Sequence, residues 1–122
     1  MKWLSKTISG ERRALERARR RFVEKPTEER LHDVRTAGRR FRSLLEDVAS
    51  LEPAEQLLRR VKRAAIATDA ARDASILRRL LESSVDSVET EIASPLLREL
   101  LKREKLATRR ASQKLRQMRF AP

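Results

Sequence analysis

Residues 31–45 read LHDVRTAGRRFRSLL, and this stretch decides the fold because its apolar and charged side chains separate at helical spacing. At 100° per residue, the apolar side chains point into one arc and most cations fall within a neighbouring arc of about 80°. The apolar arc contains Leu31, Val34, Phe41, Leu45 and, three residues further on, Val48. The cationic arc contains His32, Arg35, Arg39 and Arg42. We therefore predict an amphipathic helix with one packing face and one basic face beside it.

Residues that favour helix ends lie on either side of this stretch. Thr27 is followed by two glutamates, a pattern typical of a helix N-terminus because acids oppose the positive end of the helix dipole. The helix is then expected to run to about Ser50. Upstream, Ser9 or Gly10 could open a first helix that ends before Pro26.

Two further helices are expected in the second half of the chain. Pro53 begins the third, whose apolar pattern either continues or breaks at Thr68 or Asp69, and we expect a kink there. Residues 81–97 are expected to form a linker or a short helix. The Ser-Pro pair at 94–95 fits the N-cap and first turn of a last helix.

Length and composition are consistent with one domain over residues 1–122, an all-α four-helix bundle. Thirty Lys and Arg stand against eighteen Asp and Glu, giving a net charge of +12, so we expect polyanionic partners. The chain has no Cys, no apolar run approaching a membrane span and no stretch resembling a signal peptide. We expect a cytoplasmic protein that does not contact membranes.

Enzyme chemistry would need side chains that this sequence lacks. His32 is the one histidine, and nothing places a serine beside it. Gly10 and Gly38 belong to no phosphate-binding loop motif. Glu28 and His32 are spaced as half of a zinc site, and the other half is missing. We predict no catalytic residue, no metal and no cofactor.

A second basic cluster follows in the third predicted helix. Its cations are Arg59, Arg60, Lys62 and Arg63. In an unbroken helix Arg72 would fall in the apolar sector, so it needs a partner or a cavity. Asp69 and Asp73, one turn apart, could clamp arginines of the preceding helix or bind a divalent ion, and we expect the arginine pairing. Ordinary solvated helix faces are the competing interpretation of both clusters.

The pattern from His32 to Arg42, followed about thirty residues later by Arg72-Asp73, resembles the CHAD family, helical domains named for a histidine at this place in their second helix. The resemblance implies non-catalytic binding of inorganic polyphosphate, with Asp73 orienting an arginine. It implies phosphate contacts from His32, Arg35, Arg39, Arg40, Arg42, Lys62, Arg63 and Arg72.

The resemblance also bears on assembly. A full CHAD domain is about twice as long and consists of two similar helical halves around a basic cavity, and this chain resembles the first half. A homodimer, with two copies facing each other, is the simplest way to complete it.

Two other functions remain open from sequence. The charge balance also fits a helical protein that binds RNA or DNA through the phosphate backbone. Aromatic residues, which would stack on bases, make up only 3% of the chain. The third possibility is an assembly protein in which the acidic segment 82–91 contacts a basic face of a neighbouring copy.

Overall fold

A computed structural model describes residues 2–48, 52–84 and 90–120. These residues form four α-helices and no strand, which confirms the all-α prediction. The helices are α1 (Lys2–Glu24), α2 (Glu28–Asp47), α3 (Glu52–Ser83) and α4 (Thr90–Arg116).

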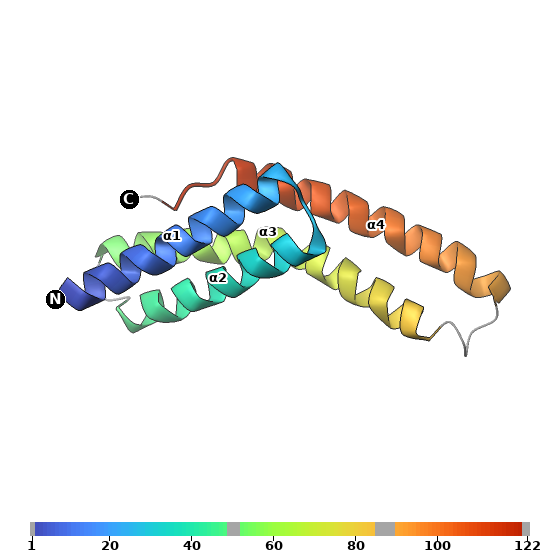
Figure 1. The fold of residues 1–122 in the computed structure, drawn as a ribbon, viewed down its shortest axis with the longest axis horizontal. Helices are drawn as coiled ribbons and strands as arrows, with labels where there is room; N and C mark the ends of the chain where they lie inside the picture. The colour runs from blue at the N-terminus through green and yellow to red at the C-terminus, as the bar shows by residue number, and fades with distance from the viewer. Residues whose placement is uncertain (1, 49–51, 85–89, 121–122) are drawn as a thin grey trace.

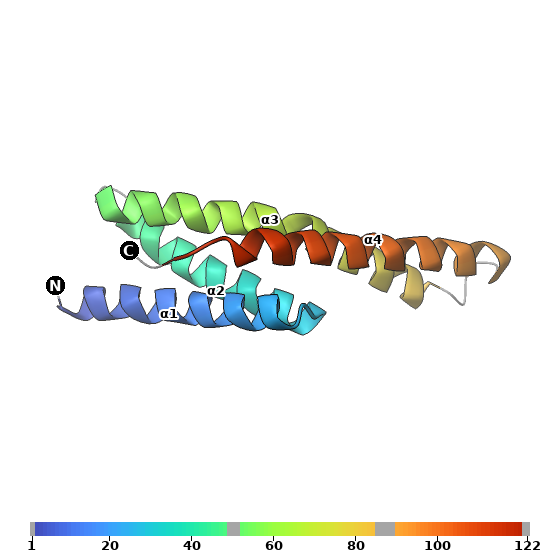
Figure 2. The ribbon, with the colours of Figure 1, turned by 90° about the horizontal axis from the view of Figure 1, so that it is seen from above.

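The four helices form two antiparallel hairpins of unequal length. Figures 1 and 2 show α1 and α2 side by side along the first part of α3 and the last part of α4. The last part of α3 and the first part of α4 run side by side and project beyond α1 and α2 (Figure 1). We call this end, residues 72–83 and 90–103, the projecting arm. Its junction with α2 forms the inner corner of the molecule.

The core lies where all four helices meet, and it contains the apolar stripes expected from the sequence. Phe22, Phe41 and Phe120 are completely buried there, so an aromatic side chain from α1, from α2 and from the C-terminal segment meet in one cluster. The other members of this cluster are Leu15, Leu31, Val34, Leu45, Ala54, Leu58, Val61, Ala64, Ala71, Ala111 and Leu115.

The first helix begins earlier than predicted. Neither Ser9 nor Gly10 opens it, because α1 is already helical from Lys2. The apolar spacing that marks the stripe extends upstream to Ile8, which packs against the core. Gly10 therefore lies inside the helix.

The second helix begins where predicted. Thr27 has an extended backbone and its Oγ1 accepts a hydrogen bond from the Arg30 amide at 3.2 Å, which is the N-cap arrangement. The helix ends at Asp47 with Val48 as C-cap, slightly before the expected end at Ser50, a residue outside the described ranges.

The third helix continues without a break past Thr68 and Asp69, where a kink was expected. Thr68 is buried and its hydroxyl donates to the carbonyl oxygens of Ala64 and Ala65, at 3.2 and 2.9 Å. Hydrogen bonds of this kind bend helices without ending them. Accordingly α3 is one helix, and Figure 1 shows its course turning away from α2 towards the projecting arm.

The last helix begins before the Ser-Pro pair. The N-terminus predicted at Ser94 is wrong, since α4 starts at Thr90 and Pro95 lies inside it. Ala93 is buried in the projecting arm, so packing fixes this additional turn. Pro95 has no backbone amide, so one helical hydrogen bond is absent near the start of α4. Residues 81–97 were expected to form a linker or a short helix; most of them belong instead to the end of α3 and the start of α4, and 85–89 lie outside the described residues.

Candidate functional site

A concavity of about 860 Å³ opens at the inner corner, where the first half of α2 faces the second half of α3. We call it the α2–α3 concavity. Of the predicted phosphate contacts, it brings together His32, Arg35 and Arg39 from α2 with Arg72 from α3. The other residues that line the concavity are Thr27, Glu28, Glu29, Leu31, Ser75, Ile76 and Arg79.

The apolar stripe of α2 determines where its cations point. Leu31, Val34 and Phe41 are buried against α1 and α3, which fixes the rotation of the helix about its axis. Arg35 and Arg39 therefore leave the helix at the border between the packed and the exposed surface.

Arg35 is held in place by three groups of α3. Its NH1 donates to Thr68 Oγ1 at 2.7 Å, to Asp69 Oδ1 at 3.0 Å and to the Ala65 carbonyl at 3.3 Å. Only 18% of its side chain is exposed. The expectation that Asp69 clamps an arginine of α2 is confirmed by this pair. Thr68, buried beneath it, was not anticipated as a partner.

Arg72 pairs with its sequence neighbour. Its Nε and NH2 donate to Asp73 Oδ1 at 3.1 and 2.9 Å, and both side chains are substantially exposed. Asp73 thus contacts an arginine of its own helix and not one of α2. Arg72 thus has both a partner and a place at the concavity, but its side chain is exposed and does not lie in the apolar sector as predicted for an unbroken helix.

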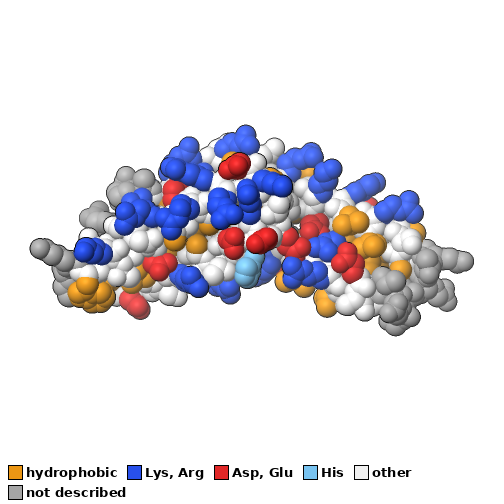
Figure 3. Space-filling model, in the orientation of Figure 1, with side chains coloured by type: hydrophobic (Ala, Val, Ile, Leu, Met, Phe, Trp, Pro, Cys, Tyr) orange, Lys and Arg blue, Asp and Glu red, His pale blue; other side chains and the backbone are white. Residues whose placement is uncertain are grey.

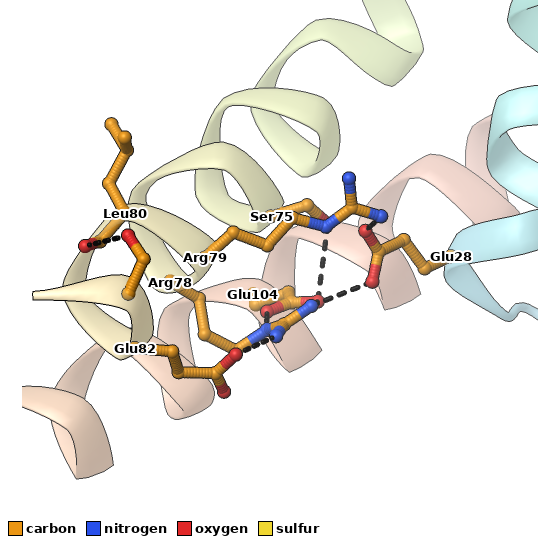
Figure 4. Close-up of polar contacts among 8 residues, drawn as sticks. Glu28, Ser75, Arg78, Arg79, Leu80, Glu82 and Glu104 are labelled. Atoms are coloured by element: carbon orange, nitrogen blue, oxygen red, sulfur yellow. Dashed lines mark hydrogen bonds and ion pairs between the residues drawn. The ribbon is translucent and has the colours of Figure 1, made fainter. Parts of the chain in front are cut away.

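Two neighbouring arginines of α3, which the sequence did not single out, contact α2 beside the concavity. Arg79 lines it and pairs with Glu28 of α2. Arg78, beside it, faces the helix interface and has three carboxylate partners, Glu28, Glu82 and Glu104 (Figure 4). Its position in the pattern RRLLES gave no signal, because its partners come from three different helices.

The Arg78 cluster fixes the angle between α2 and the projecting arm. The Arg78 NH2 lies 2.7 Å from Glu28 Oε2 and the NH1 lies 2.9 Å from Glu82 Oε2. The hydrogen bond with Glu104 raises the pKa of Arg78 above its ordinary value. Ser75 adds a hydrogen bond to Glu104 at 3.2 Å. These contacts occupy all the guanidinium nitrogens, so Arg78 has a structural role.

Arg39 and His32 are the basic residues of the concavity that carry no carboxylate partner among the described residues. Both side chains are exposed. His32 Nε2 lies 3.4 Å from the Thr36 hydroxyl, and Arg39 has no hydrogen bond or ion pair within the described ranges. A polyanion can therefore reach both of them without breaking an existing ion pair.

The other predicted contacts lie elsewhere. Arg42 pairs with Glu46 at 2.9 Å and lines a small cavity of about 50 Å³ with Arg35 and Arg39, continuing the row along α2. Arg40 opens into a different groove, between α1 and α2. Two contacts from α3 lie outside the concavity: Lys62 is exposed, and Arg63 faces Gln117, Met118 and Arg119.

The described part of the chain has neither a cluster of metal ligands nor a membrane-spanning helix. It contains no group of three or more His, Cys, Asp or Glu side chains that could hold a metal ion. No helix within it is long and apolar enough to cross a membrane.

Comparison with known proteins places this arrangement in a family. No curated protein and no solved structure matches the chain. The profile of the CHAD domain matches residues 6–122, which includes all of α2, α3 and α4 and nearly all of α1. The chain therefore belongs to the CHAD domain family.

Proposed function

We propose that this protein binds inorganic polyphosphate without catalysis, and that the α2–α3 concavity is the centre of the site. Membership of the CHAD family supports this function in general terms. The observation that carries the proposal is the convergence of Arg39 and His32 from α2 with Arg72 from α3 on one open concavity. Arg35, which also lines the concavity, remains a predicted contact, as do Arg40, Arg42, Lys62 and Arg63.

The shape of the site favours an extended anion over a small one. His32, Arg35, Arg39 and Arg42 follow one another at intervals of about one helical turn, a row of roughly 15 Å. Arginine forks bind phosphate oxygens in pairs, so such a row matches successive phosphates of a chain. An open concavity lined on two sides also leaves room for the chain to enter and leave.

The aromatic residues argue against single-stranded nucleic acid as the preferred ligand. Phe22, Phe41 and Phe120 are completely buried and cannot stack on bases. Trp3, which is 65% exposed, lies in the first turn of α1, whereas the concavity is lined by α2 and α3 alone. A ligand recognised through phosphates alone fits these surroundings better than one recognised through bases.

We further propose that two copies of the chain complete the site. Ile76 lines the concavity, and Leu77 and Leu80 continue from it along the exposed side of α3. These three side chains are 46%, 53% and 58% exposed, and apolar groups gathered on one helix face are typical of an interface. A second copy on this face would lie directly beside the concavity.

Competition with other polyanions tests the proposal. Labelled long-chain polyphosphate is bound to the full chain and challenged with RNA and with duplex DNA at matched phosphate concentration. We expect polyphosphate to resist both competitors. Equal competition by nucleic acid would show a general polyanion binder and would overturn the proposal.

Matched variants test the site. Arg39→Ala/Arg72→Ala removes two exposed arginines of the concavity, and Arg98→Ala/Arg110→Ala removes two exposed arginines of α4. Both variants lose the same charge. We expect the concavity variant to weaken binding at least about tenfold more than the α4 variant, since charge-assisted hydrogen bonds are lost only in the former. Equal losses would assign the binding to overall charge.

A further inference from the structure

A second basic groove, of about 280 Å³, lies between α1 and α2 and adjoins the α2–α3 concavity across the outer ridge of α2. We call it the α1–α2 groove. Its cations are Arg17 and Arg21 from α1 and Arg30 and Arg40 from α2, and its acids are Glu11 and Asp33. Figure 3 shows that Lys and Arg side chains gather over α1 and continue along α4 on this face.

Fewer of the arginines in this groove are paired with carboxylates than in the concavity. Within the described ranges, Arg17, Arg21 and Arg40 have no hydrogen bond or ion pair from their side chains. In the concavity, by contrast, all the arginines except Arg39 pair with carboxylates. The α1–α2 groove therefore attracts an anion without first having to release an acid.

The dimensions of the groove match an extended ligand. Arg30 and Arg40 are ten residues apart on α2, which corresponds to about 15 Å along the helix axis. The Arg30 guanidinium donates to the Arg21 carbonyl at 2.8 Å, so these two residues meet at one end of the groove. Arg17 lies one turn further along α1. Cations thus line both walls, about one helical turn apart on α1 and ten residues apart on α2.

The two sites are separated only by a row of side chains on the outer surface of α2. Arg39 and Arg40 are consecutive, and they open into the concavity and the groove respectively. Thr36 lines the groove while its hydroxyl lies 3.4 Å from Nε2 of His32, which lines the concavity. A chain that leaves one site can therefore enter the other by crossing the outer surface of α2.

We propose that the α1–α2 groove is a second phosphate-binding subsite, which holds the same polyphosphate chain that occupies the concavity. This inference rests on the proposed function. Two linked subsites bind a ligand that reaches both far more tightly than a ligand that reaches one. Tripolyphosphate is shorter than the roughly 10 Å diameter of α2 and occupies one subsite at a time. The groove therefore makes affinity depend on chain length.

The test compares the dissociation constants of long-chain polyphosphate and tripolyphosphate by calorimetry, each expressed per molecule of ligand. We expect the full chain to bind the long polymer at least about a hundredfold more tightly. In Arg17→Ala/Arg21→Ala this preference should fall at least about tenfold. In the charge-matched control Arg98→Ala/Arg110→Ala it should stay within about twofold of the unmodified protein, because these exposed residues line neither site.

The outcomes separate the two proposals. If the unmodified protein binds polyphosphate but the groove variant and the control keep the same preference, the groove is not a subsite and the proposed function stands. If the unmodified protein does not bind polyphosphate, or RNA displaces it equally, both proposals are overturned. Circular dichroism of each variant checks that the exposed substitutions leave the helical content unchanged.

Discussion

The Arg35 guanidinium of α2 lies 3.0 Å from Oδ1 of Asp69 on α3, so a cation of the candidate site is already paired before any ligand arrives. The same NH1 donates to the buried Thr68 hydroxyl at 2.7 Å. This contact joins the two helices that form the concavity and fixes the direction of one donor. It also means that an anion at Arg35 competes with a carboxylate, whereas an anion at Arg39 does not.

Replacing Asp69 by asparagine should strengthen polyanion binding. Asp69→Asn removes the charge that competes for Arg35 and keeps a side chain that can accept its hydrogen bond. We expect affinity for polyphosphate to rise several-fold, and the free energy of unfolding to fall by less than about 1 kcal/mol because Asp69 is nearly half exposed. Glu99→Gln on α4 is the control, since it changes the net charge equally. Weaker binding in Asp69→Asn would show that orientation of Arg35 outweighs its neutralisation.

Removing the His32 side chain should weaken polyanion binding. The exposed His32 lies in the concavity with no carboxylate partner in the described part of the chain, so its imidazole can donate a hydrogen bond to a ligand without breaking an ion pair. We expect His32→Ala to lower the affinity for polyphosphate several-fold, measured by calorimetry. Unchanged affinity in His32→Ala would exclude the residue from the site.

The parts of this structure that follow from local sequence were predictable, and those that depend on distant contacts were not. The stripe through Val34 and Phe41 and the cap at Thr27 each depend on residues within a few turns, and the structure has them as expected. The start of α4 depends on burial of Ala93 against α3, which no local pattern reports. For the same reason the Ser-Pro pair gave the wrong N-terminus.

The sequence allowed several basic residues of the candidate site to be predicted, but not how they are arranged in space. Helical spacing correctly put His32, Arg35 and Arg39 on one side of α2. The same spacing could not tell that Arg79 joins them, because that depends on the course of α3 past α2. Among the ion pairs of the site, the sequence predicted only the one that Asp69 forms with an arginine of α2. The pairs around Arg78 could not be predicted, because their carboxylates come from three helices.

The buried pair of Glu16 and Arg19 should make stability depend on pH. Burial alone would raise the pKa of Glu16, but the hydrogen bond and charge of Arg19, aided by Arg20 and the Phe120 amide, hold it below its ordinary value. Because the pKa is lower in the folded than in the unfolded chain, the pair stabilises the fold above the ordinary carboxyl pKa. That contribution is lost as the pH falls through the lowered value.

The variant Glu16→Gln tests this pair. At pH 7 it leaves the buried Arg19 without its carboxylate, and we expect the free energy of unfolding to fall by about 3 kcal/mol. At an acid pH below the lowered pKa of Glu16, the difference from the unmodified protein should shrink, since Glu16 itself is then protonated. Urea unfolding at both pH values measures the effect, with the exposed Glu24→Gln as control. A difference that is the same at both pH values would contradict the assignment.

Removing Arg78 should loosen the projecting arm. Arg78→Met leaves the carboxylates of Glu28, Glu82 and Glu104 without their shared cation, and we expect a loss of about 3–5 kcal/mol in the free energy of unfolding. Arg78→Lys should be intermediate, because one ammonium group cannot reach three carboxylates in the geometry of a guanidinium. Urea unfolding compares both with Arg63→Met, whose arginine is exposed and has no ion pair within the described residues. Equal stability of Arg78→Met and Arg63→Met would refute the structural role.

Charging the exposed face of the projecting arm should separate two copies of the chain. If Ile76, Leu77 and Leu80 form the interface, sedimentation equilibrium of the unmodified protein should give twice the chain mass of 14.2 kDa. Leu77→Glu/Leu80→Glu places two carboxylates in each face and should give the mass of one chain, with helical content retained because both positions are exposed.

The control for that experiment charges an apolar position elsewhere. Leu106→Glu lies on α4 and is 46% exposed, and it should leave the mass doubled. The monomeric variant should also bind long-chain polyphosphate more weakly than Leu106→Glu, because a site completed by a second copy loses half of its cations on dissociation. An unmodified protein that remains a single chain at every concentration would overturn the dimer. A monomeric variant with undiminished affinity would instead show that one copy holds the complete site.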